Sequence, residues 1–472
     1  MQARTPSRPT YVLGAGFSKA VSEAMPLMDE LGRVLQERLA GEIPFELLPE
    51  QSFEDWLTLQ VTPLPFLEGF ANARRSANAA RVVAEIAKVL DVREAEAAAA
   101  LTPLWLRQLL ALWDAEQAAV LTFNYDTLIE RAVNADQIAT AENEHDVGVA
   151  VGDHVVYPAP PAPPAITWGD FGSPHTAASF QLLKLHGSLA WFWSETDAAG
   201  STLVRVRERG AFGSTRIASN DHDFSGTTTL DRYLIPPVTS KDGYYGSYLA
   251  NTLWRSARAI VADTVSITLI GYSLPSGDRV AGQLIAECDP ACTISVVDLY
   301  PGQENPASGV VSRLRALGRP ATSLYSGTEC VRNFVAEKLQ SAILALPDAA
   351  ALQEADRGSA DVAVAIAHEG SADVYLLAWN SGKGVFETHR VDLNEGQRSN
   401  MPFREIALNS LPSGMGRLED FVTEERFNEY ISGGQPFVFT HPTNSENVVA
   451  VGARRLKVAS WELLLLKWAP LG

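Results

Sequence analysis

The stretch Tyr11-Val12-Leu13-Gly14-Ala15-Gly16-Phe17-Ser18 decides the fold of this 472-residue chain. Three apolar residues run directly into two closely spaced glycines, and a helical pattern follows from Phe17 to about Leu39. The order strand, glycine turn, helix is typical of α/β units in which backbone N–H groups and a helix N-terminus approach a diphosphate. Lys19 stands where the usual dinucleotide fingerprint has its third glycine, so a tight turn without a ligand is the alternative.

The same pattern recurs along the chain, because further apolar runs end at polar residues and alternate with helical sequence. Helical composition occupies residues 71–120, 245–262 and 329–346. The apolar runs are Ala118–Phe123, Phe180–Leu185, Ser266–Ile270, Thr293–Val297 and Ala321–Tyr325. This alternation predicts an α/β fold, a Rossmann-like parallel sheet with helices on both faces. Polar residues at the carboxyl ends of such strands lie at the edge where open α/β sheets bind ligands.

The domain organisation follows from changes in composition. We expect one domain over residues 1–346, with a helical subdomain at about 40–117, and a smaller β-rich domain over 347–472. The proline-rich part of residues 141–178 can form neither a helix nor a central strand, so we predict a surface loop there. The strands expected in the C-terminal domain are 362–366, 374–379, 385–391, 436–439 and 447–451.

Two polar clusters could carry chemistry at strand ends. Asn124-Tyr125-Asp126 follows one strand, and its side chains could bind an amide, a ribose or a water, or could cap the next helix. His186, in Lys184-Leu185-His186-Gly187-Ser188, can accept a proton near neutral pH, although a lone histidine is more often structural. The nearby Trp191, Phe192 and Trp193 could line a cleft, but we favour a core position for most of them.

Two later strands end at further candidates. Gly271 and Ser273, in Ile270-Gly271-Tyr272-Ser273-Leu274-Pro275, could contact phosphate or ribose oxygens, with Asp278 close behind them. Asp298 could accept hydrogen bonds from ribose hydroxyls, or it could belong to an ordinary turn at the end of its strand.

Taken in this order, Gly-Ala-Gly-Phe-Ser, Asn-Tyr-Asp, Leu-His-Gly and Gly-Tyr-Ser-Leu-Pro resemble the sirtuin-like NAD-binding fold. The sequence is more similar to the bacterial sirtuin-like NAD hydrolases of antiphage defence than to protein deacetylases, because of Pro26-Leu27 and the Tyr within Asn-Tyr-Asp. The resemblance covers about residues 10–300 and extends less surely to 345.

The resemblance implies roles for these residues. Asn124 and His186 would be catalytic, Asn124 orienting the nicotinamide ribose or the attacking water and His186 acting as general base. The glycine turn would hold the diphosphate and the nearby ribose of NAD, and Asp126 would face the nicotinamide amide. Gly271, Ser273 and Asp298 would contact the phosphate and adenosine end. The expected binding residues are Gly14, Ala15, Gly16, Phe17, Ser18, Asp126, Gly271, Ser273 and Asp298.

The cysteines bear on which branch of the family the chain resembles. The family's deacetylases carry a zinc ribbon with paired Cys-x-x-Cys motifs, whereas this chain has three cysteines and only one pair, Cys288-x-x-x-Cys292. We therefore expect no zinc and NAD as substrate, and the missing zinc ribbon favours NAD hydrolysis over peptide deacetylation. So few cysteines also fit a reducing cytoplasm rather than a disulfide framework.

Composition limits the partners. The net charge of −18 argues against a nucleic-acid coat, and no run of eighteen apolar residues predicts a membrane span. The leading hypothesis is a triggered NAD⁺ glycohydrolase that depletes NAD in antiphage defence. A non-catalytic NAD or ADP-ribose sensor is the alternative. A third possibility, compatible with the first, is a subunit of a defence complex. The resemblance implies a homo-oligomer or a partner such as an ATPase or a short Argonaute.

Overall fold

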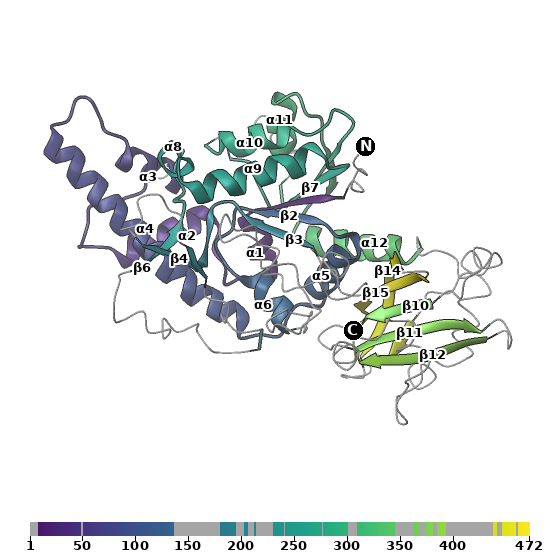
Figure 1. Cartoon of the computed structure of the whole chain (residues 1–472). Coiled ribbons are helices and arrows are strands. Elements are labelled where there is room, and N and C mark those ends of the chain that lie inside the picture. Colours follow the sequence, from purple (N-terminus) through teal and green to yellow (C-terminus); the bar gives the residue numbers. More distant parts are fainter. Residues whose placement is uncertain are drawn as a thin grey trace.

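Two six-stranded sheets organise the chain in a computed structural model (Figure 1). The structure describes residues 8–48, 51–135, 180–194, 203–205, 212–213, 230–239, 241–275, 277–300, 309–344, 363–367, 373–380, 385–392, 438–440, 446–458 and 461–472. The proline-rich segment predicted as a surface loop lies outside these residues.

The first sheet is parallel throughout and has the order β3-β2-β1-β7-β8-β9. Its strands are β1 (Thr10–Leu13), β2 (Ala119–Thr122), β3 (Gln181–Lys184), β7 (Ser266–Ile270), β8 (Thr293–Val297) and β9 (Thr322–Tyr325). The chain runs outward from β1 in one direction and then crosses to β7 on the other side. This reversal makes the carboxyl ends of β1 and β7 the topological switch point of a doubly wound sheet. The Rossmann-like prediction is confirmed.

Helices cover both faces of this sheet (Figure 1). The helices that follow or precede its strands are α1 (Ala15–Val21), α2 (Met28–Arg38), α6 (Leu128–Ala135), α8 (Asp242–Tyr245), α9 (Tyr248–Ala262), α10 (Arg279–Ala286), α11 (Val310–Ala316) and α12 (Cys330–Leu344). The single helix predicted from Phe17 to Leu39 is wrong, because the chain leaves the helical path between Val21 and Met28. Pro26 lies in this break, and proline disfavours helical backbone in the residue before it.

The helical insertion between β1 and β2 contains α3 (Phe53–Val61), α4 (Gly69–Ala98) and α5 (Leu104–Glu116). Two of these, α4 and α5, occupy the segment 71–120 in which two or three helices are predicted. A three-stranded antiparallel sheet, which the sequence did not predict, follows β3 and has the order β5-β4-β6. Its strands are β4 (Gly187–Ser194), β5 (Leu203–Arg205) and β6 (Leu230–Leu234).

The second six-stranded sheet lies at the C-terminal end of the chain and has the order β12-β11-β10-β15-β14-β13. Its strands are β10 (Ala363–Ala367), β11 (Asp373–Asn380), β12 (Val385–Asp392), β13 (Val438–Thr440), β14 (Asn447–Val458) and β15 (Trp461–Pro470). The smaller β-rich region is therefore present, although β15 was not predicted. In Figure 1, β14 and β15 lie against α5 and α12, which belong to the first part of the chain.

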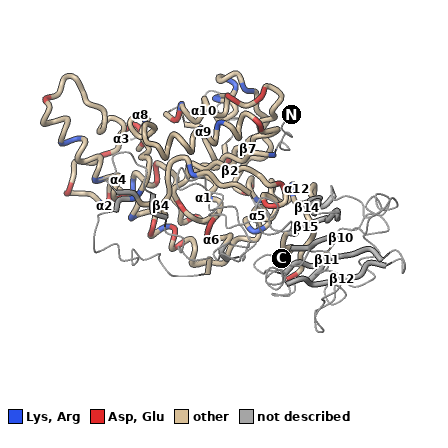
Figure 2. Tube along the Cα trace, viewed as in Figure 1, with Lys and Arg blue, Asp and Glu red and all other residues tan. Residues whose placement is uncertain are grey.

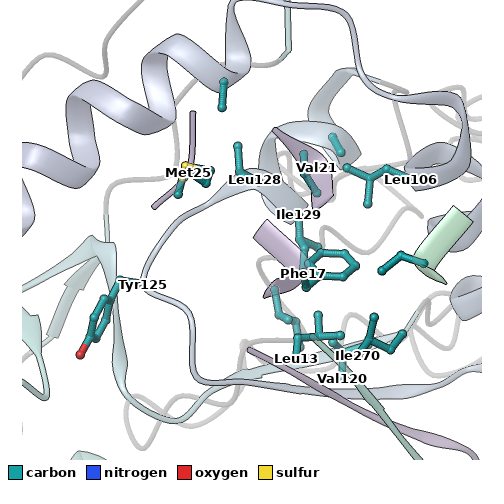
Figure 3. Close-up of a cluster of buried hydrophobic side chains, with 14 of the residues drawn as sticks. Leu13, Phe17, Val21, Met25, Leu106, Val120, Tyr125, Leu128, Ile129 and Ile270 are labelled. Atoms are coloured by element: carbon teal, nitrogen blue, oxygen red, sulfur yellow. The ribbon is translucent and has the colours of Figure 1, made fainter. Parts of the chain in front are cut away.

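The hydrophobic core centres on α1 and its neighbours. Figure 3 shows Phe17 packed among Leu13, Val120 and Ile270 of the sheet and Ile129 of α6. The same cluster extends to Val449, Val451 and Ala469 of the C-terminal sheet. Figure 2 shows Lys and Arg interspersed with Asp and Glu over the described helices. None of the helices that the structure describes is long and apolar enough to cross a membrane.

Candidate functional site

The register of the parallel sheet brings the predicted clusters to one edge. Leu13 pairs with both Thr122 and Ile270, Thr122 pairs with Lys184, and Ile270 pairs with Val297. The residues immediately after this last rung are Gly14, Phe123, Leu185, Gly271 and Asp298. All five strand-end clusters therefore begin level with one another, as the sequence predicted.

The glycine turn is built by close packing of two backbones. A Cβ on Gly14 would lie 2.7 Å from the Gly271 oxygen, and one on Gly271 would lie 2.2 Å from the Phe17 nitrogen. Gly271 also has φ +57°, a left-handed conformation that favours glycine. Gly16 donates its N–H to the Gly271 oxygen at 2.9 Å. The glycines thus join β1 to β7 at the switch point, and the Gly16 N–H is already engaged within the protein.

We name Gly14, Ser18, Asn124 and Asp126 the amide cluster. Asn124 Nδ2 donates to the Gly14 oxygen at 2.8 Å and to Ser18 Oγ at 2.8 Å. Because a carbonyl oxygen can only accept, Nδ2 must face Gly14, and both amide hydrogens are used. Asn124 Oδ1 then remains as an acceptor, and no described residue donates a hydrogen bond to it.

Asp126 is the fourth member of the amide cluster and bonds both Ser18 and the start of α6. Ser18 Oγ donates to Asp126 Oδ2 at 2.6 Å, and the Leu128 N–H donates to Asp126 Oδ1 at 3.2 Å. The carboxylate therefore accepts the first N–H of α6, which agrees with the helix-capping role that the sequence offered as an alternative. The same carboxylate also orients Ser18. Burial raises the pKa of Asp126, and the Lys184 ammonium and the Ser18 hydroxyl oppose that rise.

A buried ion pair behind the amide cluster fixes the start of α6. Glu94 of α4 accepts from the Thr127 N–H at 2.8 Å and from its hydroxyl at 2.7 Å. Arg131 Nε donates to Glu94 Oε1 at 2.7 Å, and both side chains are almost fully buried. The helical insertion therefore holds the loop that carries Asn124.

His186 lies at the end of β3 in an aromatic pocket. Its ring centroid is 4.9 Å from that of Phe123 and 6.3 Å from that of Trp254. Burial lowers the pKa of His186 to about 3; Asp278 opposes this fall and Lys241 adds to it. The imidazole is therefore neutral at physiological pH and, in this state, a weak base.

Gly187 makes room for the protein's own backbone beside His186. A Cβ on Gly187, whose φ is +89°, would lie 2.0 Å from the Tyr233 oxygen. The Ile235 N–H also donates to the His186 oxygen at 2.8 Å. The small residue allows β6 to pass close to the site, and Trp191, at 1% exposed, is a core residue.

Around His186, the structure adds four polar residues whose roles the sequence did not predict. We name His186, Glu54, Lys241, Tyr272 and Asp278 the histidine cluster. Lys241 Nζ lies 3.2 Å from Asp278 Oδ1, the Tyr272 hydroxyl donates to Asp278 Oδ2 at 2.8 Å, and His186 Nε2 lies 3.9 Å from Asp278 Oδ1. Only Asp278 stood out in the sequence, by its position after a strand end, and no short motif joins these residues.

The remaining predicted residues lie on the β7 and β8 side of the edge. The Ser273 side chain is exposed, and its backbone oxygen accepts from Arg313 Nε at 3.1 Å. Asp298 Oδ1 accepts from the Tyr300 N–H at 3.0 Å, the arrangement of a turn at the end of a strand. Burial raises the pKa of Asp298. Among the described residues, no group of three or more His, Cys, Asp or Glu could hold a metal ion.

The chain is similar to solved structures of Sir2 proteins. No protein-family model matches the sequence, and no curated protein matches it. The chain is similar to a mutant Sir2 homologue in complex with 2′-O-acetyl-ADP-ribose, with 12% identity and a TM-score of 0.34, over 70% of this chain and 92% of that chain. It is also similar to a mutant Sir2 homologue in complex with ADP-ribose, with 15% identity and a TM-score of 0.33, over 71% of this chain and 94% of that chain.

Proposed function

We propose that this chain is an NAD⁺ glycohydrolase, which cleaves the bond between nicotinamide and ribose and releases nicotinamide and ADP-ribose. The observation that carries the proposal is the pairing of an oriented amide with a neutral imidazole at adjacent strand ends. Asn124 and His186 each stand two residues beyond Thr122 and Lys184, which pair in the sheet. Asn124 bonds the Gly14 oxygen at the switch point, where doubly wound sheets bind dinucleotides, and His186 lies one strand further out on the same edge.

The chemistry makes modest demands on the protein. Glycosidic cleavage passes through an oxocarbenium-like state, and the positively charged nicotinamide of NAD⁺ leaves as a neutral molecule. No acid is needed for the leaving group, so the protein has only to hold the ribose, stabilise the cation and deliver a water. Asn124 Oδ1 is an acceptor held in place by two hydrogen bonds, suited to a ribose hydroxyl or the water, and His186 can take the proton from that water.

The binding of the anionic diphosphate is proposed at the β1–α1 turn. The chain has a net charge of −18, so we assign the diphosphate to this turn rather than to a basic surface. The N–H groups of Gly14, Gly16 and Phe17 already donate within the protein. Gly271, Ser273 and Asp298 extend the proposed site toward the adenosine end along the same edge. We also propose that the enzyme is zinc-independent and acts, when triggered, as an NAD-depleting effector of antiphage defence.

The first test is nicotinamide release from NAD⁺ by the purified chain, alone and with candidate activators. Asn124→Ala and His186→Ala should each lower the rate by about 10²- to 10⁴-fold, the contribution of a positioned base or water-orienting group. Asn251→Ala is a matched control, because Asn251 is exposed on α9 and its amide bonds only nearby backbone oxygens.

The outcomes separate the enzyme from a sensor. NAD⁺ binding without nicotinamide release under every activating condition would contradict the proposed hydrolysis and indicate a binding module. Chromatography of the product distinguishes ADP-ribose from a cyclic form. Loss of NAD⁺ in cells that express the chain with its genomic neighbours, and not with the His186→Ala variant, tests the effector role.

A further inference from the structure

Asp278 is the centre of the histidine cluster. Its two oxygens contact the Lys241 ammonium at 3.2 Å and the Tyr272 hydroxyl at 2.8 Å, and Asp278 and Lys241 are each 4% exposed. Buried charges of this kind are costly unless they are paired, and here each charge has a partner. The cluster is therefore a paired arrangement rather than an accidental burial.

The position of Asp278 in the chain would ordinarily give it another task. It is the residue before α10, where aspartate commonly accepts a hydrogen bond from the N–H groups of the first helical turn. No such side-chain bond is present, and only the Asp278 backbone oxygen accepts from Gly282. The carboxylate is instead turned away from its helix and toward His186.

His186 has an unsatisfied nitrogen that faces this carboxylate. Nε2 is buried and has no hydrogen-bond partner among the described residues, and Asp278 Oδ1 lies 3.9 Å from it. That distance is too long for a hydrogen bond. Catalytic hydrogen bonds are often long in the absence of substrate and shorten when it binds.

We propose that Asp278 is a positioning residue for His186, accepting the Nε2 proton when substrate is bound and leaving Nδ1 as the basic nitrogen. The inference rests on the proposed NAD⁺ hydrolysis and deepens it. In that reaction a water proton passes to Nδ1 as the water oxygen bonds to the ribose anomeric carbon. The electron pair of the broken carbon–nitrogen bond goes to nicotinamide. The imidazolium, its Nε2–H still donated to Asp278, then loses the proton to solvent.

Lys241 and Glu54 set the charge of this arrangement. Lys241 pairs with Asp278 and lies 3.9 Å from Glu54 Oε1, which α3 contributes from the helical insertion. Thr58 Oγ1 of α3 also accepts a hydrogen bond from the Thr239 N–H at 2.8 Å. Thr239 lies two residues before Lys241, so this bond joins α3 to the segment that carries Lys241. The charged groups that act on His186 are thus Asp278 and Lys241, and Glu54 and Tyr272 in turn contact these two residues. Burial keeps His186 neutral until the reaction protonates it, and Lys241 adds to this effect by balancing the carboxylate.

The test combines histidine tautomer measurements with kinetics. In ¹⁵N-histidine-labelled protein bound to ADP-ribose, with His186→Gln to assign the signal, the wild type should show His186 protonated at Nε2. The double variant Asp278→Ala/Lys241→Met removes both members of the ion pair, so no buried charge is left alone. It should lose this preference and show a kcat for nicotinamide release lower by about tenfold or more, with KM changed less than about twofold.

Two further variants keep the test decisive. Lys241→Met alone, which leaves the Asp278 charge facing His186, should raise the pH at which the acid limb of the kcat profile falls. Asp55→Asn, an exposed neighbour of Glu54 on α3, is the matched control and should change neither measurement.

The results distinguish failure of the positioning role from failure of the proposed function. An unchanged tautomer and kcat in the double variant would overturn the positioning role while leaving NAD⁺ hydrolysis standing. If the double variant does not fold, an acid limb that does not move in Lys241→Met overturns it instead. A wild type that never releases nicotinamide would overturn the proposed function, and the inference with it.

Discussion

The amide cluster and the histidine cluster, both at the edge of the parallel sheet, differ in whether their polar atoms have hydrogen-bond partners. In the amide cluster, Ser18, Asn124 and Asp126 are joined by hydrogen bonds of 2.6 to 2.8 Å. In the histidine cluster, His186 Nε2 has no described partner, and its nearest carboxylate oxygen is 3.9 Å away. The first cluster is organised before any ligand binds, whereas the second has a contact still to form. Substitutions in the first should therefore affect stability as well as turnover, and those in the second should mainly affect turnover and pH dependence.

The largest stability effect is expected for Glu94→Ala, behind the amide cluster. The change leaves Arg131 buried without its carboxylate and removes both bonds to Thr127. Breaking a buried ion pair in this way should lower the free energy of unfolding by about 3–5 kcal/mol. Urea unfolding followed by circular dichroism measures it. Glu96→Ala, an exposed position on the same helix, is the control, and an equal loss there would contradict the assigned role of Glu94.

A smaller stability loss is expected for Ser18→Ala, within the amide cluster itself. The hydroxyl both donates to Asp126 and accepts from Asn124, so its removal takes one of two hydrogen-bond partners from each of these side chains. The free energy of unfolding should fall by about 1–3 kcal/mol. Ser22→Ala, one turn further along and without such a bridge, provides the comparison. A loss below about 0.5 kcal/mol in Ser18→Ala would show that the cluster is not preorganised.

The smallest effect on stability is expected for His186 in the histidine cluster, and it appears only below about pH 6.5. The pKa of His186 is about 3 in the folded chain and 6.5 as an ordinary histidine, so between these values the unfolded chain binds more protons. The burial of His186 therefore lowers the free energy of unfolding as the pH falls below 6.5, by about 1.4 kcal/mol at pH 5.5, and has almost no effect at pH 7. His186→Gln should lose less stability than the wild type between pH 7 and 5.5. Equal slopes in the two proteins would show that His186 titrates normally.

The sequence predicted the amide cluster better than the histidine cluster for a physical reason. Gly14, Asn124 and His186 follow strands, and the parallel register of those strands carries them to one edge whatever lies between them. Lys241 and Glu54 reach the site from a loop and from the helical insertion, so no periodicity or spacing links them to a strand end. The break after α1 was missed because the apolar pattern continues through it. The strand β4 was missed because only Leu185 and His186 separate it from β3, in a single sharp turn that ends at Gly187 with φ +89°.

The contact between α5 and the C-terminal sheet has a practical consequence for anyone who shortens this chain. Arg107 of α5 forms two hydrogen bonds of 2.7 Å with Glu446, and Gln108 donates to the Pro470 oxygen at 3.0 Å. Beneath these bonds, Val449, Val451 and Ala469 belong to the same apolar cluster as the buried face of α5. A fragment ending before β13 would expose that face to water and would therefore be prone to aggregate.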